Sequence, residues 1–237
     1  MFRRYMDFAK LVSLLSSQSL YLSRSDKFRD VFEGRIFGLK VLKERLEGRG
    51  FSGGNDFISA AFDEYMKERS ELADFLREHV FINCWHLNEE QSAAMWDLYI
   101  KNGEGIAVQT TFGRLKQSLN YCKKDIYIGK VKYIDHKKED NYFCDKISPF
   151  FTKRLSFKHE EEVRLVYSAS DDREVHMNKP ESHDVYGVNI EVDIFELIER
   201  IYISPDAPTW FKNVVEVILE KFNIDVEVIH SKLYELN

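Results

Sequence analysis

Short segments with the pattern of a β-strand alternate along this chain with segments that carry the apolar stripe of a helix. The strand-like segments are residues 2–5, 20–22, 80–85, 105–112, 128–134, 157–167, 185–192, 201–204 and 226–230. The helical segments are residues 7–17, 36–46, 56–79, 93–100, 112–121, 137–154, 194–199 and 210–222. Because the two kinds are interspersed, we expect an α+β fold, with a mixed, mostly antiparallel sheet and surrounding helices.

The length of the chain suits one large hydrophobic core. It has 237 residues, of which 44% are hydrophobic. The stretch GRGFSGGN predicts a surface loop between two helices. No internal repeat or low-complexity linker divides the sequence, so we expect a single domain over residues 1–237, with a helical insertion at about 36–79.

Charge and cysteine content restrict the partners and the compartment. The formal net charge of −6 argues against bulk electrostatic binding to nucleic acid or to anionic lipid. No run approaches the roughly 20 apolar residues of a membrane span, so we expect no membrane association. The three cysteines, Cys84, Cys122 and Cys144, are far apart in the sequence, which favours reduced thiols in a cytoplasmic protein.

The strand-like segment FKHEEEVRLVY carries more charge than a strand usually does. Strand side chains alternate between faces, so Glu160, Glu162 and Arg164 should share one face. Three apolar side chains should be buried on the other face: Val163, Leu165 and Tyr167. The charged face is either a solvated surface with an ion pair or the floor of a functional site.

A polar turn, SRSDKFRDVFEG, concentrates acids and arginines. Its charged residues are Arg24, Asp26, Arg29, Asp30 and Glu33. Carboxylates in such a turn often cap a following helix. The alternative is that the turn covers a ligand and that its arginines meet anionic groups.

Aromatic residues and a histidine gather around residues 85–99. Met95 and Trp96 fit a core stripe of a helix. His86 and Tyr99 are better candidates for a ligand site, because each has a polar tip on an aromatic body.

The sequence does not predict a metal site. It has no His-x-x-x-His pair and no cysteine cluster, so zinc is not expected. Its acids are scattered and show no spacing that demands Mg²⁺. It also lacks a P-loop, a dinucleotide-binding glycine motif and a serine nucleophile elbow.

Four segments resemble the bacterial domain-of-unknown-function 2971 family. They are LYLSRSDKFRDVFEG, CWHLNEEQSAAMWDLYIKNGEGIAV, GKVKY and KRLSFKHEEEVRLVY. In the last, the family's Phe-x-x-Glu-x-Glu-x-Arg pattern matches Phe157, Glu160, Glu162 and Arg164. The turn departs from the family's Asn-Asp-Pro, because Arg29 and Val31 flank Asp30. The resemblance implies one fold unit over nearly the whole chain, and the family name states no function.

The order of elements also resembles, more loosely, the layout of ADP-ribosyltransferases. A basic residue, Arg4, stands on the first strand, helix 7–17 follows, and LYLS, with Tyr21, corresponds to a short strand that covers the ligand. A Glu-x-Glu pair, Glu160 and Glu162, opens a late strand.

This second resemblance implies NAD as a substrate and a small nucleotide as ligand. Glu162 would be the key catalytic carboxylate, and Glu160 would position or deprotonate the acceptor. Arg4 and Arg24 would bind NAD. A carboxylate beside the ribose stabilises the oxocarbenium-like state in which the glycosidic bond breaks.

Two other classes of function stay open. One is a metal-dependent nuclease, in which acids hold Mg²⁺ and a basic residue contacts phosphate. The residues for it would be Asp30, Glu33, Glu160 and Glu162, with Lys153 or Arg154. The other is a non-catalytic sensor or partner-binding module, in which the Glu–Arg strand is structural pairing.

Overall fold

The fold is built on one large sheet, and the computed structural model describes residues 1–35, 44, 56–139, 145–171 and 186–236. Nine strands form this sheet: β1 (Phe2–Asp7), β2 (Ser19–Arg24), β3 (Val80–Leu87), β4 (Gly105–Thr110), β5 (Ile126–Lys130), β8 (Glu162–Ser168), β9 (Gly187–Glu191), β10 (Arg200–Ile203) and β11 (Glu227–His230). A separate two-stranded sheet consists of β6 (Lys132–Ile134) and β7 (Thr152–Arg154).

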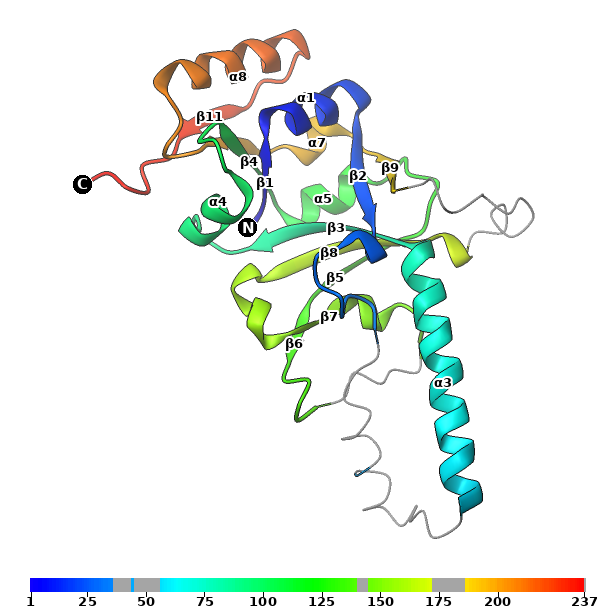
Figure 1. Cartoon of the computed structure of the whole chain (residues 1–237). Coiled ribbons are helices and arrows are strands. Elements are labelled where there is room, and N and C mark those ends of the chain that lie inside the picture. Colours follow the sequence, from blue (N-terminus) through cyan, green and yellow to red (C-terminus); the bar gives the residue numbers. More distant parts are fainter. Residues whose placement is uncertain (36–43, 45–55, 140–144, 172–185, 237) are drawn as a thin grey trace.

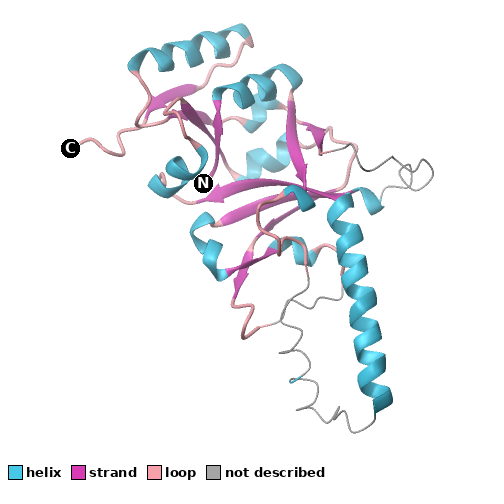
Figure 2. Ribbon diagram, viewed as in Figure 1, coloured by secondary structure: helices cyan, strands magenta, loops and turns pink. Residues whose placement is uncertain are grey.

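Helices surround the sheet, as Figure 2 shows. They are α1 (Phe8–Ser17), α3 (Asp56–His79), α4 (Ala93–Tyr99), α5 (Phe112–Ser118), α7 (Ile194–Leu197) and α8 (Thr209–Lys221). Short 3₁₀ turns are η1 (Ser25–Lys27), η2 (Ser148–Phe151), η3 (Leu155–Glu160) and η4 (Ala169–Asp171). The expected α+β class with a mixed, mostly antiparallel sheet is confirmed, since in the described parts of the chain only β10–β11 and β6–β7 pair in parallel.

The sheet divides at β3. The strand order is β11-β10-β4-β1-β3-β2-β9. One edge of β3 pairs with β1 and β2, and the other edge pairs with β8, which in turn pairs with β5. Along its first edge, β3 pairs with β2 at Phe81 and Ile82 and with β1 at His86 and Leu87. The residues between them, 83–85, pair with β8 alone. We call this interruption, where β1 and β2 diverge, the fork (residues 83–85).

The main core lies on one face of the sheet. Asp7 caps α1 by accepting a hydrogen bond from the Lys10 backbone N–H at 2.8 Å. The apolar stripe of α1 then packs with residues of α5, α7 and α8 over this face. The predicted burial of Val163, Leu165 and Tyr167 on β8 is confirmed, because all three belong to this core.

The opposite face is covered at two places. At one, Met95 and Trp96 of α4 pack on Tyr5 of β1, which confirms the core role predicted for them. At the other, Leu76 of α3 packs with Phe150 of η2, and α3 extends away from the sheet (Figure 1). The face of β8 that carries Glu162 and Arg164 belongs to this side of the sheet.

Some local predictions are wrong. Glu160 is not part of the charged strand: it ends η3, and Glu161, with φ 36° and ψ 58°, turns the chain before β8 begins. The predicted helix 137–154 is replaced, among the described residues, by η2 and β7, because Pro149 starts a 3₁₀ turn. The predicted strand 128–134 breaks after Lys130, and its two parts join different sheets.

The helix predictions vary in outcome. Predicted helix 56–79 is confirmed as α3. Ser92 caps α4 by accepting a hydrogen bond from the Met95 backbone N–H. The predicted helix 36–46, apart from residue 44, lies outside the described residues. Within the described part of the chain, none of the helices combines the length and apolar character that crossing a bilayer requires.

Candidate functional site

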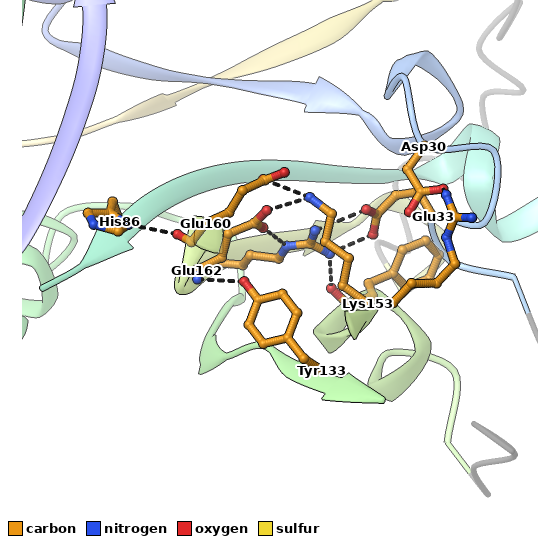
Figure 3. A network of polar contacts seen from close by, with 10 residues as sticks. Asp30, Glu33, His86, Tyr133, Lys153, Glu160 and Glu162 are labelled. Carbon is orange, nitrogen blue, oxygen red and sulfur yellow. Dashed lines mark hydrogen bonds and ion pairs between the residues drawn. The ribbon is translucent and has the colours of Figure 1, made fainter. Parts of the chain in front are cut away.

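Arg164 is the centre of a buried set of ion pairs on β8. Its Nε donates to Glu162 Oε2 at 2.5 Å, and its two terminal nitrogens donate to the Glu33 carboxylate at 2.5 and 2.9 Å. Nη1 also donates to the Phe150 carbonyl at 2.6 Å (Figure 3). The side chain is fully buried. A guanidinium whose donors are engaged in this way holds the fold together and has little left to offer a ligand.

Lys153 joins the two glutamates of the sequence motif. Its Nζ donates to Glu160 Oε2 at 2.8 Å and to Glu162 Oε1 at 2.6 Å (Figure 3). The Tyr133 hydroxyl accepts a hydrogen bond from the Glu162 backbone N–H at 2.9 Å. Glu160 and Glu162 therefore meet although Glu160 lies outside the strand, because Lys153 of β7 lies between their carboxyl groups.

These contacts define the charge network, which consists of Glu33, Lys153, Glu160, Glu162 and Arg164. It holds three carboxyl groups and two cations, so full ionisation leaves one surplus negative charge in a buried place. Such a surplus favours retention of a proton.

Burial raises the pKa of two carboxyl groups of the network, those of Glu33 and Glu160, and so favours retention of a proton there. Burial, together with the neighbouring Glu162 carboxyl, raises the pKa of Glu160 to about 7 against the opposing effect of Lys153. For Glu162, burial also acts to raise the pKa, but Arg164, Glu160 and Lys153 outweigh it and the net direction is down. Near neutral pH, Glu162 is therefore ionised and Glu160 exchanges its proton readily.

The polar turn contacts this network. Glu33 reaches Arg164, and Asp30 accepts a hydrogen bond from Arg154 at 2.6 Å. The Arg154 guanidinium also lies over the ring of Phe32, 4.4 Å from its centroid. Arg24, in contrast, forms a two-point pair with Asp26 at 2.7 and 3.0 Å within the turn itself.

A cleft of about 200 Å³ opens at the fork. Most of its lining comes from β1, β2, β3 and α4, and Glu160 and Glu162 also line it. Six residues singled out from the sequence line it: Arg4, Tyr21, His86, Tyr99, Glu160 and Glu162. Four others do not: Arg24, Asp30, Glu33 and Arg164. The predicted site residues therefore fall into two groups: six line the cleft, and the other four form ion pairs outside it.

Arg4 is half-buried in this cleft and has one weak contact. Its Nη2 donates to the Tyr21 carbonyl at 3.4 Å, and Asn83 Nδ2 donates to the same oxygen at 2.8 Å. Among the described residues, no carboxylate forms an ion pair with Arg4. Burial lowers the pKa of Arg4 to about 10, so the guanidinium stays charged at neutral pH. A charged group with so few partners is suited to bind an anion.

His86 and Cys84 lie on the β3 wall of the cleft. His86 Nδ1 lies 2.8 Å from the Glu160 carbonyl, which can only accept, so this nitrogen carries the proton. Burial lowers the pKa of His86, which favours the neutral ring. Burial and the Glu162 charge raise the pKa of Cys84, so its thiol is a poor nucleophile.

Tyr99, the last residue of α4, also lines the cleft. Burial and the negative charges of Glu160 and Glu162 raise its pKa, while Arg4 lowers it. Its side chain remains 45% exposed, as does that of Tyr21 at 46%. Both rings are thus accessible to a ligand that enters from solvent.

Sequence reasoning missed three residues of this site. Lys153 was considered only as a phosphate contact of a nuclease, and the structure places it between two glutamates. Asn83 and Tyr133 were not singled out at all. The repulsion between two neighbouring carboxylates was the one available signal, since it requires a nearby cation.

Comparison of the chain with models of protein families, with curated proteins and with solved structures found no match. The resemblance to the domain-of-unknown-function 2971 family stays a prediction. Among the described residues, no group of three or more His, Cys, Asp or Glu side chains is placed to hold a metal ion.

Proposed function

We propose that this protein is an enzyme that transfers a group from a phosphate-bearing nucleotide, with NAD as the first candidate substrate. One observation carries the proposal. Two groups line the same cleft: the Arg4 guanidinium, which has no carboxylate partner within the described ranges, and the Glu160 carboxyl group, whose pKa is about 7. The first is suited to a phosphate group and the second to proton transfer.

The chemistry follows from these two groups and the network behind them. In a transfer from NAD, the bond between ribose C1′ and the nicotinamide nitrogen breaks, and nicotinamide leaves with the electron pair. An acceptor oxygen or nitrogen bonds to C1′, and its proton passes to the Glu160 carboxylate. When Glu160 is ionised, the network carries one surplus negative charge, which supports the positive charge that develops on the ribose.

This assignment changes the roles that the resemblance implies for the two glutamates. Glu162 is held by both Lys153 and Arg164, so its part is to keep a fixed charge and to orient Lys153. Glu160 is the residue that exchanges a proton. The volume of about 200 Å³ is smaller than the roughly 300–1,000 Å³ of pockets for drug-sized ligands, so the cleft takes the reacting part of a dinucleotide and leaves the remainder outside.

The nuclease alternative has no observation in its favour. Each acid that it requires is engaged by a cation: Asp30 by Arg154, Glu33 by Arg164, and the two motif glutamates by Lys153. A metal ion would have to displace these basic side chains.

The test combines ligand binding with turnover. Thermal unfolding is followed with NAD, ADP-ribose, nicotinamide mononucleotide or Mg²⁺, and NAD consumption is measured in parallel. We expect the nucleotides to raise the melting temperature, since a ligand at 100 times its Kd stabilises by about 2.7 kcal/mol. Arg4→Met should remove this shift, whereas Arg200→Met, which changes an arginine on β10 outside the cleft, should retain it.

The catalytic role of Glu160 has a matched control in the next residue. Glu160→Gln should lower the rate of NAD consumption by about 10²–10⁴-fold while binding persists. Glu161→Gln removes the same charge from an exposed side chain outside the cleft and should leave the rate unchanged. A shift with Mg²⁺ alone would support the nuclease, and nucleotide binding without turnover would support the sensor. Either result would overturn the transferase.

A further inference from the structure

The cleft contains two buried hydrogen-bond acceptors that have no donor among the described residues. They are His86 Nε2 and Asn83 Oδ1, and the two side chains are 3% and 2% exposed. Both residues line the cleft. A buried polar atom without a partner is rare in folded proteins, because its desolvation is costly. Two other residues that line the cleft, Arg3 and Trp85, each have a buried donor without a partner among the described residues, Nε and Nε1. These atoms in one cleft point to a ligand whose groups both donate and accept hydrogen bonds, as hydroxyl groups do.

The chemical character of each atom is fixed by its neighbour. His86 Nδ1 must donate to the Glu160 carbonyl, so in the neutral ring Nε2 has a free lone pair (Figure 3). Asn83 Nδ2 must donate to the Tyr21 carbonyl, so the other atom of the amide is the oxygen. Both free atoms are therefore acceptors, and neither can pair with an anionic oxygen of the ligand.

The position of Arg4 relates one acceptor to the anion site. Arg4 and Asn83 donate to the same Tyr21 carbonyl, so the guanidinium and the amide are neighbours. The other acceptor is next to Glu160, whose carbonyl binds His86. A matching ligand has an anionic group, a hydrogen-bond donor close to that group, and a second donor nearer to the reacting end.

We infer, on the basis of the proposed function, that the cleft recognises a ribosyl phosphate unit through its free hydroxyl groups. Arg4 binds the phosphate, and Asn83 Oδ1 and His86 Nε2 accept hydrogen bonds from the sugar. This unit offers neutral O–H donors beside a phosphate, which a simple carboxylate, inorganic phosphate or a bare nucleobase does not. His86 and Asn83 thus determine the ligand class, while Arg4 supplies the attraction to the anion.

Calorimetric titration with four compounds tests this inference. The probes are ribose 5-phosphate, 2-deoxyribose 5-phosphate, inorganic phosphate and AMP. We expect ribose 5-phosphate to bind about tenfold or more tightly than inorganic phosphate, because each hydroxyl satisfies a buried acceptor. If AMP binds more tightly than ribose 5-phosphate, the source of the unit is a nucleotide. If the two bind equally, the source is a free sugar phosphate. Each result supports the inference.

Variants at His86 separate the acceptor from the rest of the site. His86→Met removes the acceptor and should reduce the preference for ribose 5-phosphate over inorganic phosphate, without changing the affinity for phosphate itself. His86→Gln can donate to the Glu160 carbonyl and still accept from the ligand, so it should recover most of the preference. If His86→Met does not fold, titration of the unmodified protein with the four probes still tests the inference.

The failures of the two proposals are distinguishable. Equal affinity for ribose 5-phosphate and inorganic phosphate, with both lost in Arg4→Met, would overturn this inference and leave the anion site in place. Absence of binding by every phosphate compound, or binding that Arg4→Met does not change, would overturn the proposed function itself.

Discussion

Arg3 and Arg4 are adjacent in β1, and their side chains leave the strand on opposite faces. The two guanidinium groups differ in how many hydrogen bonds they form. The Arg3 guanidinium donates to three consecutive backbone carbonyls, those of residues 88, 89 and 90, at 3.1, 2.9 and 2.6 Å. Arg4 has a single bond of 3.4 Å. One arginine thus anchors the connection between β3 and α4, and the other is left to the cleft.

Methionine substitutions at these two positions should separate stability from binding. Arg3→Met should lower the free energy of unfolding by about 2–4 kcal/mol, because three charge-assisted hydrogen bonds to backbone carbonyls are lost. Arg4→Met should change it by less than about 0.5 kcal/mol. Urea unfolding measures both. Equal losses in the two variants would mean that Arg4 is also structural.

Arg164→Leu should be among the most damaging substitutions in the charge network. It leaves Glu33 and Glu162 buried without their guanidinium, which costs about 3–5 kcal/mol. Arg200→Leu is the control, because its pair with Glu227 is at the surface and should contribute about 0–1 kcal/mol. A small loss in Arg164→Leu would show that the network relaxes and admits water.

The pH dependence of stability should report the proton on Glu160. Its pKa in the folded protein is raised to about 7 from an ordinary value of 4.5, so between these values the folded state binds more protons than the unfolded state. The contribution of this carboxyl to stability therefore falls as the pH rises from 4.5 towards 7.

Glu160→Gln cannot ionise, so the variant should gain stability relative to the unmodified protein over that range. Unfolding free energies measured from pH 5 to pH 8 check the trend, with Glu161→Gln as the control that should follow the unmodified protein. Parallel curves for Glu160→Gln and the unmodified protein would contradict a raised pKa.

Gly34→Ala should loosen the attachment of the polar turn. Gly34 has φ +68°, and an added Cβ would lie 2.3 Å from Phe150 Cε1. The backbone carbonyl of Phe150 also accepts a hydrogen bond from Arg164. Backbone strain and overpacking together predict a loss of about 1–3 kcal/mol. Gly113→Ala, in helix α5 with open space around it, should be neutral or stabilising by up to about 1 kcal/mol. Similar melting temperatures for the two variants would argue against a tight contact at Phe150.

The charged strand shows how far the sequence could predict the site. Alternation along FKHEEEVRLVY correctly placed Glu162 and Arg164 on one face, with apolar side chains opposite. It could not show that Glu161 adopts a left-handed conformation, which displaces Glu160 into the preceding turn. That conformation is uncommon for a residue other than glycine, so no local pattern indicates it.

Two features of the site could not be predicted from local sequence patterns: the position of Lys153 between the two glutamates, and the fork. Lys153 lies in a segment whose composition favoured a helix, and only the tertiary fold brings β7 under Glu160 and Glu162. The fork depends on how β1 and β2 share one edge of β3. Strand pairing is a relation between distant segments, and a pattern read along one segment does not contain it.

The fork also bears on self-association. An unpaired strand edge at the border of a sheet can pair with a strand of another molecule and start aggregation. Within β3, residues 83–85 form a short unpaired stretch of one edge, and β1 and β2 pair with the same edge on either side of it. A strand of another chain cannot lie along so short an opening, whereas a small molecule can reach it. The protein can therefore keep this stretch of sheet edge open without exposing it to its own copies.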